Sequence, residues 1–118
     1  MRREELYLND IIEAAEAIEH FVAGLKREQF LQDDLRRSAV LQKLIIIGEA
    51  AARLPKEFRD RYPEVPWGQV VSFRNILVHS YFSIKYVIVW KTAIEEVPDL
   101  RRKAAQILAQ EFGSEATP

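Results

Sequence analysis

The first part of the chain has its apolar residues at helical spacing. Between residues 4 and 25 they recur every three or four positions, as Leu8, Ile11, Ile12, Ala15, Ile18, Val22 and Leu25, while the other face carries Glu13, Glu16, Glu19 and His20. This pattern predicts an amphipathic helix with one face in a core. Gly24 is a suitable residue to end that helix, and a further turn of helix is expected at residues 28–31.

A second long helix is predicted from residue 33 or 34 to residue 54. Asp33 or Asp34 can accept the unpaired amide hydrogens of its first turn, and Pro55 disfavours helical geometry in the residue before it. The second half of this helix is apolar around most of its circumference, with Leu41, Leu44, Ile45, Ile46, Ile47, Ala50 and Ala51. Such a helix lies either at the centre of a bundle or at a subunit interface.

Shorter elements follow, with prolines at their boundaries. Residues 55–62 predict a short amphipathic helix, and residues 62–67 predict a loop. Pro66 is well placed as the first residue of the next helix, because the fixed backbone of proline suits a first turn. The apolar residues expected to face inward from that helix are Val70, Val71, Phe73, Ile76 and Leu77.

The last third of the chain also predicts helices. Residues 84–97 contain the run Tyr86-Val87-Ile88-Val89-Trp90, which by propensity resembles a strand. A lone strand would have no partner in a helical chain, so we expect a helix there and a final helix opened by Pro98. The fold class is therefore all-α, an antiparallel helical bundle with short connections. Residues 1–112 are expected to form one domain, and residues 113–118 a flexible tail.

Composition agrees with a single folded domain. The chain has 118 residues, of which 48% are hydrophobic and 30% charged, an ordinary balance for one domain with one core. The longest apolar run, near residues 44–47, is far too short to span a bilayer, and the charged N-terminus does not resemble a signal peptide. There are no cysteines, so disulfides and thiolate metal sites are excluded. We expect a cytoplasmic protein without a membrane partner.

Charge is unevenly distributed along the chain, although the net charge is only −1. Residues 1–35 carry 4 basic and 9 acidic side chains, whereas residues 36–74 carry 8 basic and 4 acidic ones. A cluster of cations could hold a phosphate backbone in spite of the overall charge. Charge by itself favours the simpler interpretation, in which these side chains belong to solvated helix faces.

The two histidines differ in their neighbours. His20 lies among glutamates and is expected to be a surface residue without a specific role. His79 is preceded by Arg74 and Asn75 and followed by Tyr81. On an ideal helix Asn75 and His79 share a face, whereas Arg74 lies roughly 140° from His79. Either the helix breaks near His79, or a site that combines Arg74 and His79 takes them from two chains.

These residue types can cleave the phosphodiester bond of RNA. A histidine with a pKa near 7 can take the proton of a ribose 2′-OH or protonate the leaving 5′-oxygen. Arginine can hold two phosphate oxygens and stabilise the charge of a phosphorane. No metal is required, since the nucleophile is the RNA's own 2′-OH, and metal-ligand spacings are absent from the sequence. The plain alternative is a histidine at a helix end that bonds nearby carbonyls.

Four blocks of sequence extend this pattern over most of the chain. They are Ile47-Gly48-Glu49-Ala50-Ala51, Tyr62-Pro63-Glu64-Val65-Pro66-Trp67, the run from Phe73 through Arg74, His79 and Tyr81 to Phe82, and Val89-Trp90 followed by Val97-Pro98-Asp99-Leu100. Together they resemble the HepT-like branch of the HEPN superfamily, from about residue 8 to residue 108. The Arg-x4-His-x-Tyr run is the signature of the superfamily, and its combination with the Gly-Glu-Ala and Pro-Trp blocks is specific to this branch.

The resemblance implies a metal-independent endoribonuclease that acts as the toxin of a two-gene toxin–antitoxin system. Such proteins are homodimers in which two copies of the motif face one cleft and RNA is the substrate. The antitoxin is a minimal nucleotidyltransferase, which in some pairs transfers AMP from ATP to the tyrosine of the motif, here Tyr81. The added phosphate and adenine beside His79 would exclude RNA by charge and bulk. No cofactor is expected.

Carried over residue by residue, the resemblance makes Arg74 and His79 the catalytic residues. Arg74 would bind the phosphate, and His79 would be the general acid/base. Asn75 would be a polar helper, and Tyr81 would orient the site and accept AMP. Glu49 matches a recurrent position of the branch, where a carboxylate that pairs helices is as plausible as a catalytic one.

Two points remain open at the level of the sequence. Tyr62 and Trp67 are interpreted as packing residues in preference to platforms for stacked bases. The alternative function is a non-catalytic helical dimer that binds or regulates a nucleotidyltransferase partner, which the pI of about 6.1 favours modestly.

Overall fold

The protein is an all-α molecule, as the sequence predicted. The computed structural model describes residues 3–116, with side chains described through residue 113, and no strand occurs in that part of the chain. The long helices are α1 (Arg3–Val22), α3 (Asp34–Arg53), α5 (Trp67–His79) and α7 (Val97–Ala116). The short ones are α2 (Arg27–Leu31), α4 (Lys56–Asp60), the 3₁₀ turn η1 (Tyr81–Ser83), α6 (Tyr86–Lys91) and the π-helix η2 (Thr92–Glu96).

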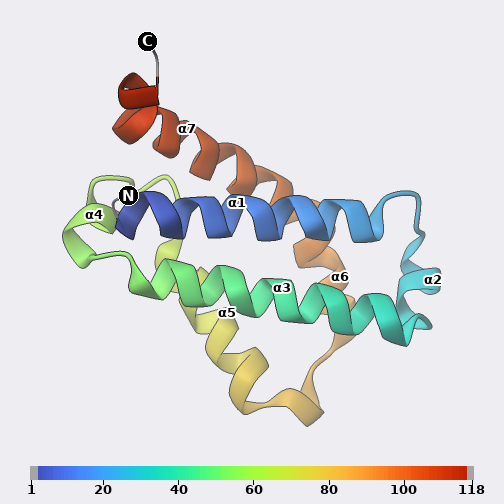
Figure 1. Ribbon diagram of the computed structural model, residues 1–118. Coiled ribbons are helices and arrows are strands. Elements are labelled where there is room, and N and C mark those ends of the chain that lie inside the picture. The colour runs from blue at the N-terminus through green and yellow to red at the C-terminus, as the bar shows by residue number, and fades with distance from the viewer. Residues whose placement is uncertain (1–2, 117–118) are drawn as a thin grey trace.

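The helices α1, α3 and α7 form the bundle. Figure 1 shows α1 and α3 side by side and antiparallel, with α7 packed across α1. The apolar stripe predicted for α1 lies in the core, and its buried residues are Leu8, Ile11, Ala14, Ala15, Ile18 and Val22. The chain leaves α1 at Gly24, whose φ of 76° lies in the left-handed region that glycine adopts without strain. The predicted stop at this residue is confirmed.

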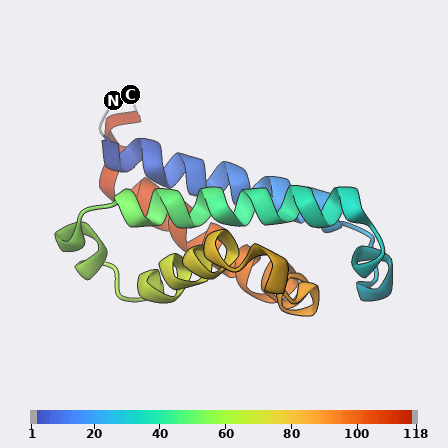
Figure 2. The same cartoon turned by 90° about the horizontal axis from the view of Figure 1, so that it is seen from below.

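The helix α3 occupies the middle of the molecule. It begins after Asp33, whose side chain accepts the backbone N–H of Arg36 at 3.0 Å, and it ends before Pro55 as predicted. It packs against α1 on one side and α5 on the other, as the view in Figure 2 shows. Its apolar circumference is therefore explained by a central position in the bundle, and Ile45 and Ile46 are half-buried against the same core.

The helix α5 diverges from the bundle. It crosses α3 and runs away from it to η1, from which α6 returns toward the bundle (Figure 1). We call residues 67–96, which comprise α5, η1, α6 and η2, the arm. The strand-like run at Tyr86–Lys91 is helical, so the choice of helix over strand is confirmed, although α6 begins two residues later than the predicted start at residue 84.

Pro98 does not open a separate helix, and that prediction was wrong. The chain continues from α6 through η2 into α7, with Pro98 in the second position of α7. Proline has no N–H to bond the carbonyl four residues earlier, and its ring crowds that carbonyl. The π-helix relieves the conflict, because Val97 donates its N–H to the carbonyl of Thr92, five residues earlier.

The end of the chain is more helical than its composition indicated. α7 extends to Ala116, past the boundary that we placed at residue 112, while residues 117 and 118 of the expected tail lie outside the described residues. The division into a domain and a tail stays a prediction. Within residues 3–116, none of the helices combines the length and the apolar character required to cross a membrane.

Candidate active site

The loop before α5 fixes where the motif helix begins. Trp67 is buried, and its indole Nε1 donates to the backbone carbonyl of Tyr62 at 3.0 Å. The Tyr62 ring is also buried, lies 5.3 Å from the ring of Phe58, and its hydroxyl donates to the carboxylate of Glu111 in α7. Both aromatic residues are packing residues, as we interpreted them, and neither offers a face on which a base could stack.

The helix α5 stays regular as far as His79. Ser80 donates its N–H to the carbonyl of Ile76 at 2.9 Å, and only at Ser80, with φ −124° and ψ 38°, does the backbone leave the helix. Arg74 and His79 therefore keep the separation of an ideal helix, roughly 140° around the axis and about 7.5 Å along it. Of the two alternatives that the spacing left open, a break near His79 does occur, but it follows the histidine and leaves its separation from Arg74 unchanged. Tyr81 lies beyond the helix end, in the 3₁₀ turn η1.

Arg74 points toward α3 and is held on two sides. Its Nη1 forms an ion pair with the carboxylate of Glu49, and its Nε donates to the side-chain oxygen of Asn75 at 2.8 Å. Its side chain is 18% exposed. The predicted site residues Arg74 and Asn75 are thus in contact, and Glu49, whose role we left open, joins them from the neighbouring helix.

His79 and Tyr81 lie apart from this group, on the exposed end of the arm. The side chain of His79 is exposed in the last turn of α5. Tyr81 is half exposed, and its ring meets the edge of the Phe82 ring at a centroid distance of 5.5 Å. Within one chain the structure does not bring His79 to Arg74. His20, by comparison, is an exposed residue of α1 beside glutamates, as predicted.

Gly48 makes room for Arg74, a contact that we did not predict from the sequence. A Cβ placed on Gly48 would overlap the Cβ and Cγ of Arg74. Only a residue without a side chain lets α3 and α5 cross this closely. A glycine inside a helix costs stability relative to alanine, so its position directly before Glu49 was the available signal of a close approach.

The arm exposes large apolar side chains in a concentration found nowhere else in the described residues. They are Ile76, Val78, Tyr81, Phe82, Val87, Ile88 and Ile94, and we call them the arm surface. Phe82 is completely exposed. Outside the arm, Leu6 and Leu35 are the exposed large apolar residues of the described chain. Exposed apolar side chains that gather in one region of a surface are typical of a contact with another molecule.

The first residue of α6, Tyr86, contacts the bundle. The guanidinium of Arg37 in α3 lies 4.7 Å from the centroid of the Tyr86 ring, a cation–π distance. Burial, first of all, raises the pKa of Tyr86, and the charge of a nearby Tyr81 phenolate would raise it further. A neutral Tyr86 therefore anchors the start of α6, and Tyr81 lies close to this anchor.

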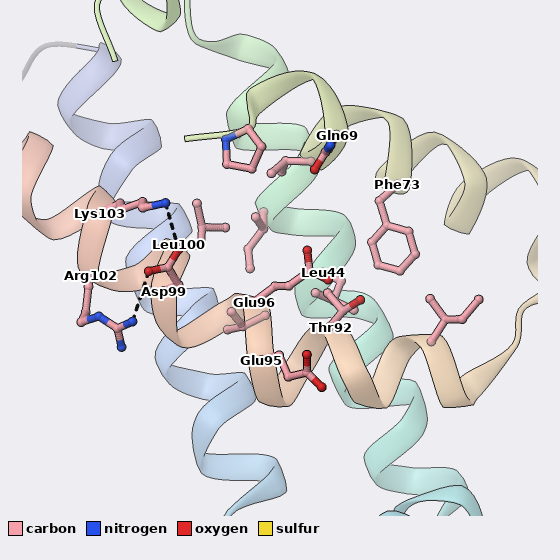
Figure 3. A pocket seen from close by; sticks show the side chains of 15 residues that line it. Leu44, Gln69, Phe73, Thr92, Glu95, Glu96, Asp99, Leu100, Arg102 and Lys103 are labelled. Atoms are coloured by element: carbon pink, nitrogen blue, oxygen red, sulfur yellow. Dashed lines mark hydrogen bonds and ion pairs between the residues drawn. The ribbon is translucent and has the colours of Figure 1, made fainter. Parts of the chain in front are cut away.

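A cavity of about 570 Å³ is lined by residues of α3, α5, η2 and the start of α7. Figure 3 shows its walls, with Gln69 and Phe73 on α5, Leu44 on α3, and Thr92 and Glu95 on η2. Asp99 at its rim pairs with Arg102 and Lys103. None of the four predicted site residues lines this cavity. The pocket of a single chain and the motif are therefore separate features.

The cations of residues 36–74 do not form one patch. Most of them pair with nearby carboxylates, in the pairs Arg36–Asp33, Arg37–Asp34, Lys56–Asp60, Arg61–Glu111 and Arg74–Glu49. These pairs are spread over α3, α4 and α5. The simpler interpretation of the basic stretch, solvated helix faces, agrees with this distribution.

Comparison with known proteins gives a consistent family. The family model described as "Ribonuclease HepT-like" matches residues 11–107. The chain is 37% identical over 111 residues to "Putative RNase TTE0752" of Caldanaerobacter subterraneus subsp. tengcongensis, which covers 94% of this chain and 99% of that protein. It is 40% identical over 102 residues to "Probable ribonuclease HepT" of Thermococcus cleftensis, covering 86% of this chain and 93% of that protein. No solved structure gives a significant match.

Proposed function

The chain belongs to the HepT-like ribonuclease family, and we propose that it cleaves RNA without a metal ion at a site shared by two copies of the chain. The observation that carries the shared site is the regularity of α5, which separates Arg74 from His79 within one chain. Two copies related by a two-fold axis can bring Arg74 of one chain to His79 of the other, and each contact then occurs twice.

The reaction needs two proton transfers and a clamp on the phosphate. The ribose 2′-oxygen attacks phosphorus, its proton passes to a base, and the bond to the 5′-oxygen breaks as that oxygen takes up a proton. The products are a 2′,3′-cyclic phosphate and a 5′-hydroxyl. His79 serves as the acid/base. Arg74 binds the non-bridging oxygens and stabilises the negative charge that grows on them.

The arm surface supports the second copy. Its apolar side chains flank the motif on both sides, from Ile76 and Val78 on α5 to Val87 and Ile88 on α6. A contact made by this surface would cover the arm and place two motifs next to each other. In the bundle, α3 buries most of its apolar circumference against α1 and α5, and Ile45 and Ile46 are half-buried.

Tyr81 supports control by a nucleotidyltransferase antitoxin. Its half-exposed hydroxyl group follows the motif histidine by two residues and lies outside the core. In the transfer, the Tyr81 oxygen attacks the α-phosphorus of ATP, loses its proton and displaces pyrophosphate, which leaves AMP on the tyrosine. The phosphate diester brings negative charge next to His79, where RNA phosphate would bind, so the modified toxin is inactive.

The first experiment incubates the purified, unmodified protein and its His79→Ala variant with single-stranded RNA in the presence of EDTA. We expect cleavage to 2′,3′-cyclic phosphate ends by the wild type, and a rate lower by about 10²–10⁴ in the variant, the usual contribution of general acid–base catalysis. His20→Ala is the matched control and should cleave normally. Uncut RNA with the wild type, together with harmless expression in cells, would leave the non-catalytic binding module as the better description.

The second experiment measures the mass of the protein after incubation with ATP and a minimal nucleotidyltransferase, if one is encoded beside it. The wild type should gain one or more AMP units and lose RNA cleavage. Tyr81→Phe should gain none, and its RNA cleavage should be the same before and after the incubation. Loss of RNA cleavage by both the wild type and Tyr81→Phe, without a change of mass in either, would instead indicate inhibition by complex formation.

A further inference from the structure

We infer that Glu49 is a positioning residue that holds the guanidinium of Arg74 in the orientation required for phosphate binding, an inference that rests on the proposed ribonuclease function. The structure shows an ion pair between the two side chains across the crossing of α3 and α5. Among the described residues, Arg74 is the only residue of the motif with which Glu49 forms an ion pair or hydrogen bond. Its influence on the reaction passes through Arg74.

The contacts of Arg74 fix its plane and leave its outer edge open. A guanidinium has five N–H donors in a rigid fork. Asn75 takes the donor of Nε, and Glu49 takes one of the two donors of Nη1. The second donor of Nη1 and both donors of Nη2 have no hydrogen-bond partner in the described part of the chain, so three donors remain for the oxygens of a phosphate.

Gly48 makes room for the stem of Arg74 at the same crossing of α3 and α5. The stem of Arg74 passes over the backbone of α3 where Gly48 has no side chain. The neighbouring Glu49 can then reach the head group while the stem stays buried against the helix. The two consecutive residues thus act on different parts of one side chain, Gly48 on its Cβ and Cγ and Glu49 on its guanidinium.

The charge of Glu49 has two opposing consequences for RNA. Its carboxylate is about half exposed and lies next to the place where a phosphate would bind, so it repels the phosphate of the bound substrate. It also restricts the rotation of Arg74, which favours the transition state if the fixed orientation is the productive one. Removal of Glu49 should therefore lower kcat without weakening substrate binding. A residue that only stabilised the fold would not divide its effect in this way.

The chain offers a matched control in the ion pair between Glu19 and Arg101. It also joins two helices, α1 and α7, with an N–O distance of 2.9 Å and partial exposure of both partners. It lies outside the arm. Glu19→Ala removes a comparable interhelical pair and should leave the kinetics of RNA cleavage unchanged.

The kinetic test compares Glu49→Ala, Glu49→Gln and Glu19→Ala with the wild type. We expect Glu49→Ala to lower kcat by about ten- to a hundredfold, the scale of a misplaced catalytic group, with an unchanged or lower KM for RNA. Glu49→Gln keeps an oxygen that can accept from Arg74 and should recover part of the loss. Wild-type kcat in Glu49→Ala, or an equal loss in Glu19→Ala, would overturn the inference.

A second measurement observes Arg74 without any catalysis. In nitrogen-15 NMR spectra, the Nη1–H signal of Arg74, the group that contacts Glu49, should be distinct and slow to exchange with water in the wild type and in Glu19→Ala, and it is assigned with Arg74→Lys. It should move to the position of a free arginine in Glu49→Ala. If the wild type cleaves no RNA but this pattern is seen, the proposed function fails while the positioning of Arg74 stands. If the signal is the same in Glu49→Ala, the positioning role is refuted whether or not the protein cleaves RNA.

Discussion

The bundle and the arm differ in how many of their apolar side chains a single chain buries. In the bundle, α1 and α3 bury their apolar stripes in one core, and interhelical charges are paired, as in Glu19–Arg101. In the arm, seven large apolar side chains remain exposed beside a histidine and a tyrosine that have no role in packing. One chain buries most of the apolar side chains of the bundle. The arm leaves seven exposed, which is typical of a surface that binds another molecule.

The two regions also differ in what the residues at their helix crossings contact. At the crossing of α3 and α5, Gly48 and Glu49 serve one side chain of the motif, Arg74. At the crossing of α1 and α7, the pair between Glu19 and Arg101 joins helices that carry no candidate catalytic group. Similar interactions therefore join two helices of the bundle in one region and hold a candidate catalytic residue in the other.

The largest expected effect is on stability, and it distinguishes the two regions directly. Ile11→Ala removes a completely buried side chain of α1 and should lower the free energy of unfolding by about 2–5 kcal/mol. Ile76→Ala makes the same chemical change on the arm surface and should change it by less than about 0.5 kcal/mol in dilute protein. Urea unfolding at low protein concentration measures both. Equal losses of stability in the two variants would contradict the difference between a buried side chain of the bundle and an exposed one of the arm.

The next effect concerns the crossing that joins the two regions. Gly48→Ala places a Cβ into the stem of Arg74 and should destabilise the protein by about 1–3 kcal/mol, since the helices must move apart. Gly68→Ala is the control within α5, because a Cβ there meets no atom within 4 Å. It should stabilise the protein by roughly 0.4–1 kcal/mol. Thermal unfolding of the two variants provides the comparison, and a stabilising Gly48→Ala would refute the close approach.

A third prediction tests what covers the arm surface. Val87→Glu places a charge among its apolar residues and should raise the dissociation constant of the dimer at least about tenfold, which corresponds to about 1.4 kcal/mol. The fold should be unaffected. Leu6→Glu alters an exposed apolar residue of the bundle and should leave the association unchanged. Sedimentation equilibrium measures both constants. A wild type that stays monomeric at high concentration would exclude the second copy as the partner of this surface.

The smallest effect appears only in alkaline solution and concerns Tyr62, at the bundle's end. Burial, and then the hydrogen bond to Glu111, raise its pKa to about 12, above the value of 10 for a free tyrosine. The folded protein thus holds this proton more tightly, so the contribution to stability is complete below pH 10 and is lost as the pH rises toward 12. The stability advantage of the wild type over Tyr62→Phe should shrink over this range in urea unfolding. A constant difference would show that Tyr62 does not titrate with this shift.

Several features could be predicted from residues close together in the sequence. Helical spacing of apolar residues located the long helices within a few positions, and Asp33, Gly24 and Pro55 marked ends that the structure confirms. Local rules failed at Pro98, because the π-helix before it depends on the hydrogen bond between Val97 and Thr92 in a continuous helix. The candidate site was recognised as a set of residue types, and the composite arrangement remains a proposal.

The sequence alone determined the all-α class, the order of the helices and the presence of Arg74, Asn75, His79 and Tyr81 in one short run. These properties follow from periodicity and residue chemistry, which are local. Only the tertiary structure decided that α3 lies at the centre of the bundle, that Gly48 and Glu49 meet Arg74, and that the arm surface is left uncovered. Each of these depends on which helix faces cross in space, and a glycine inside a helix can signal a close approach without showing which residue, 26 positions further on, makes it.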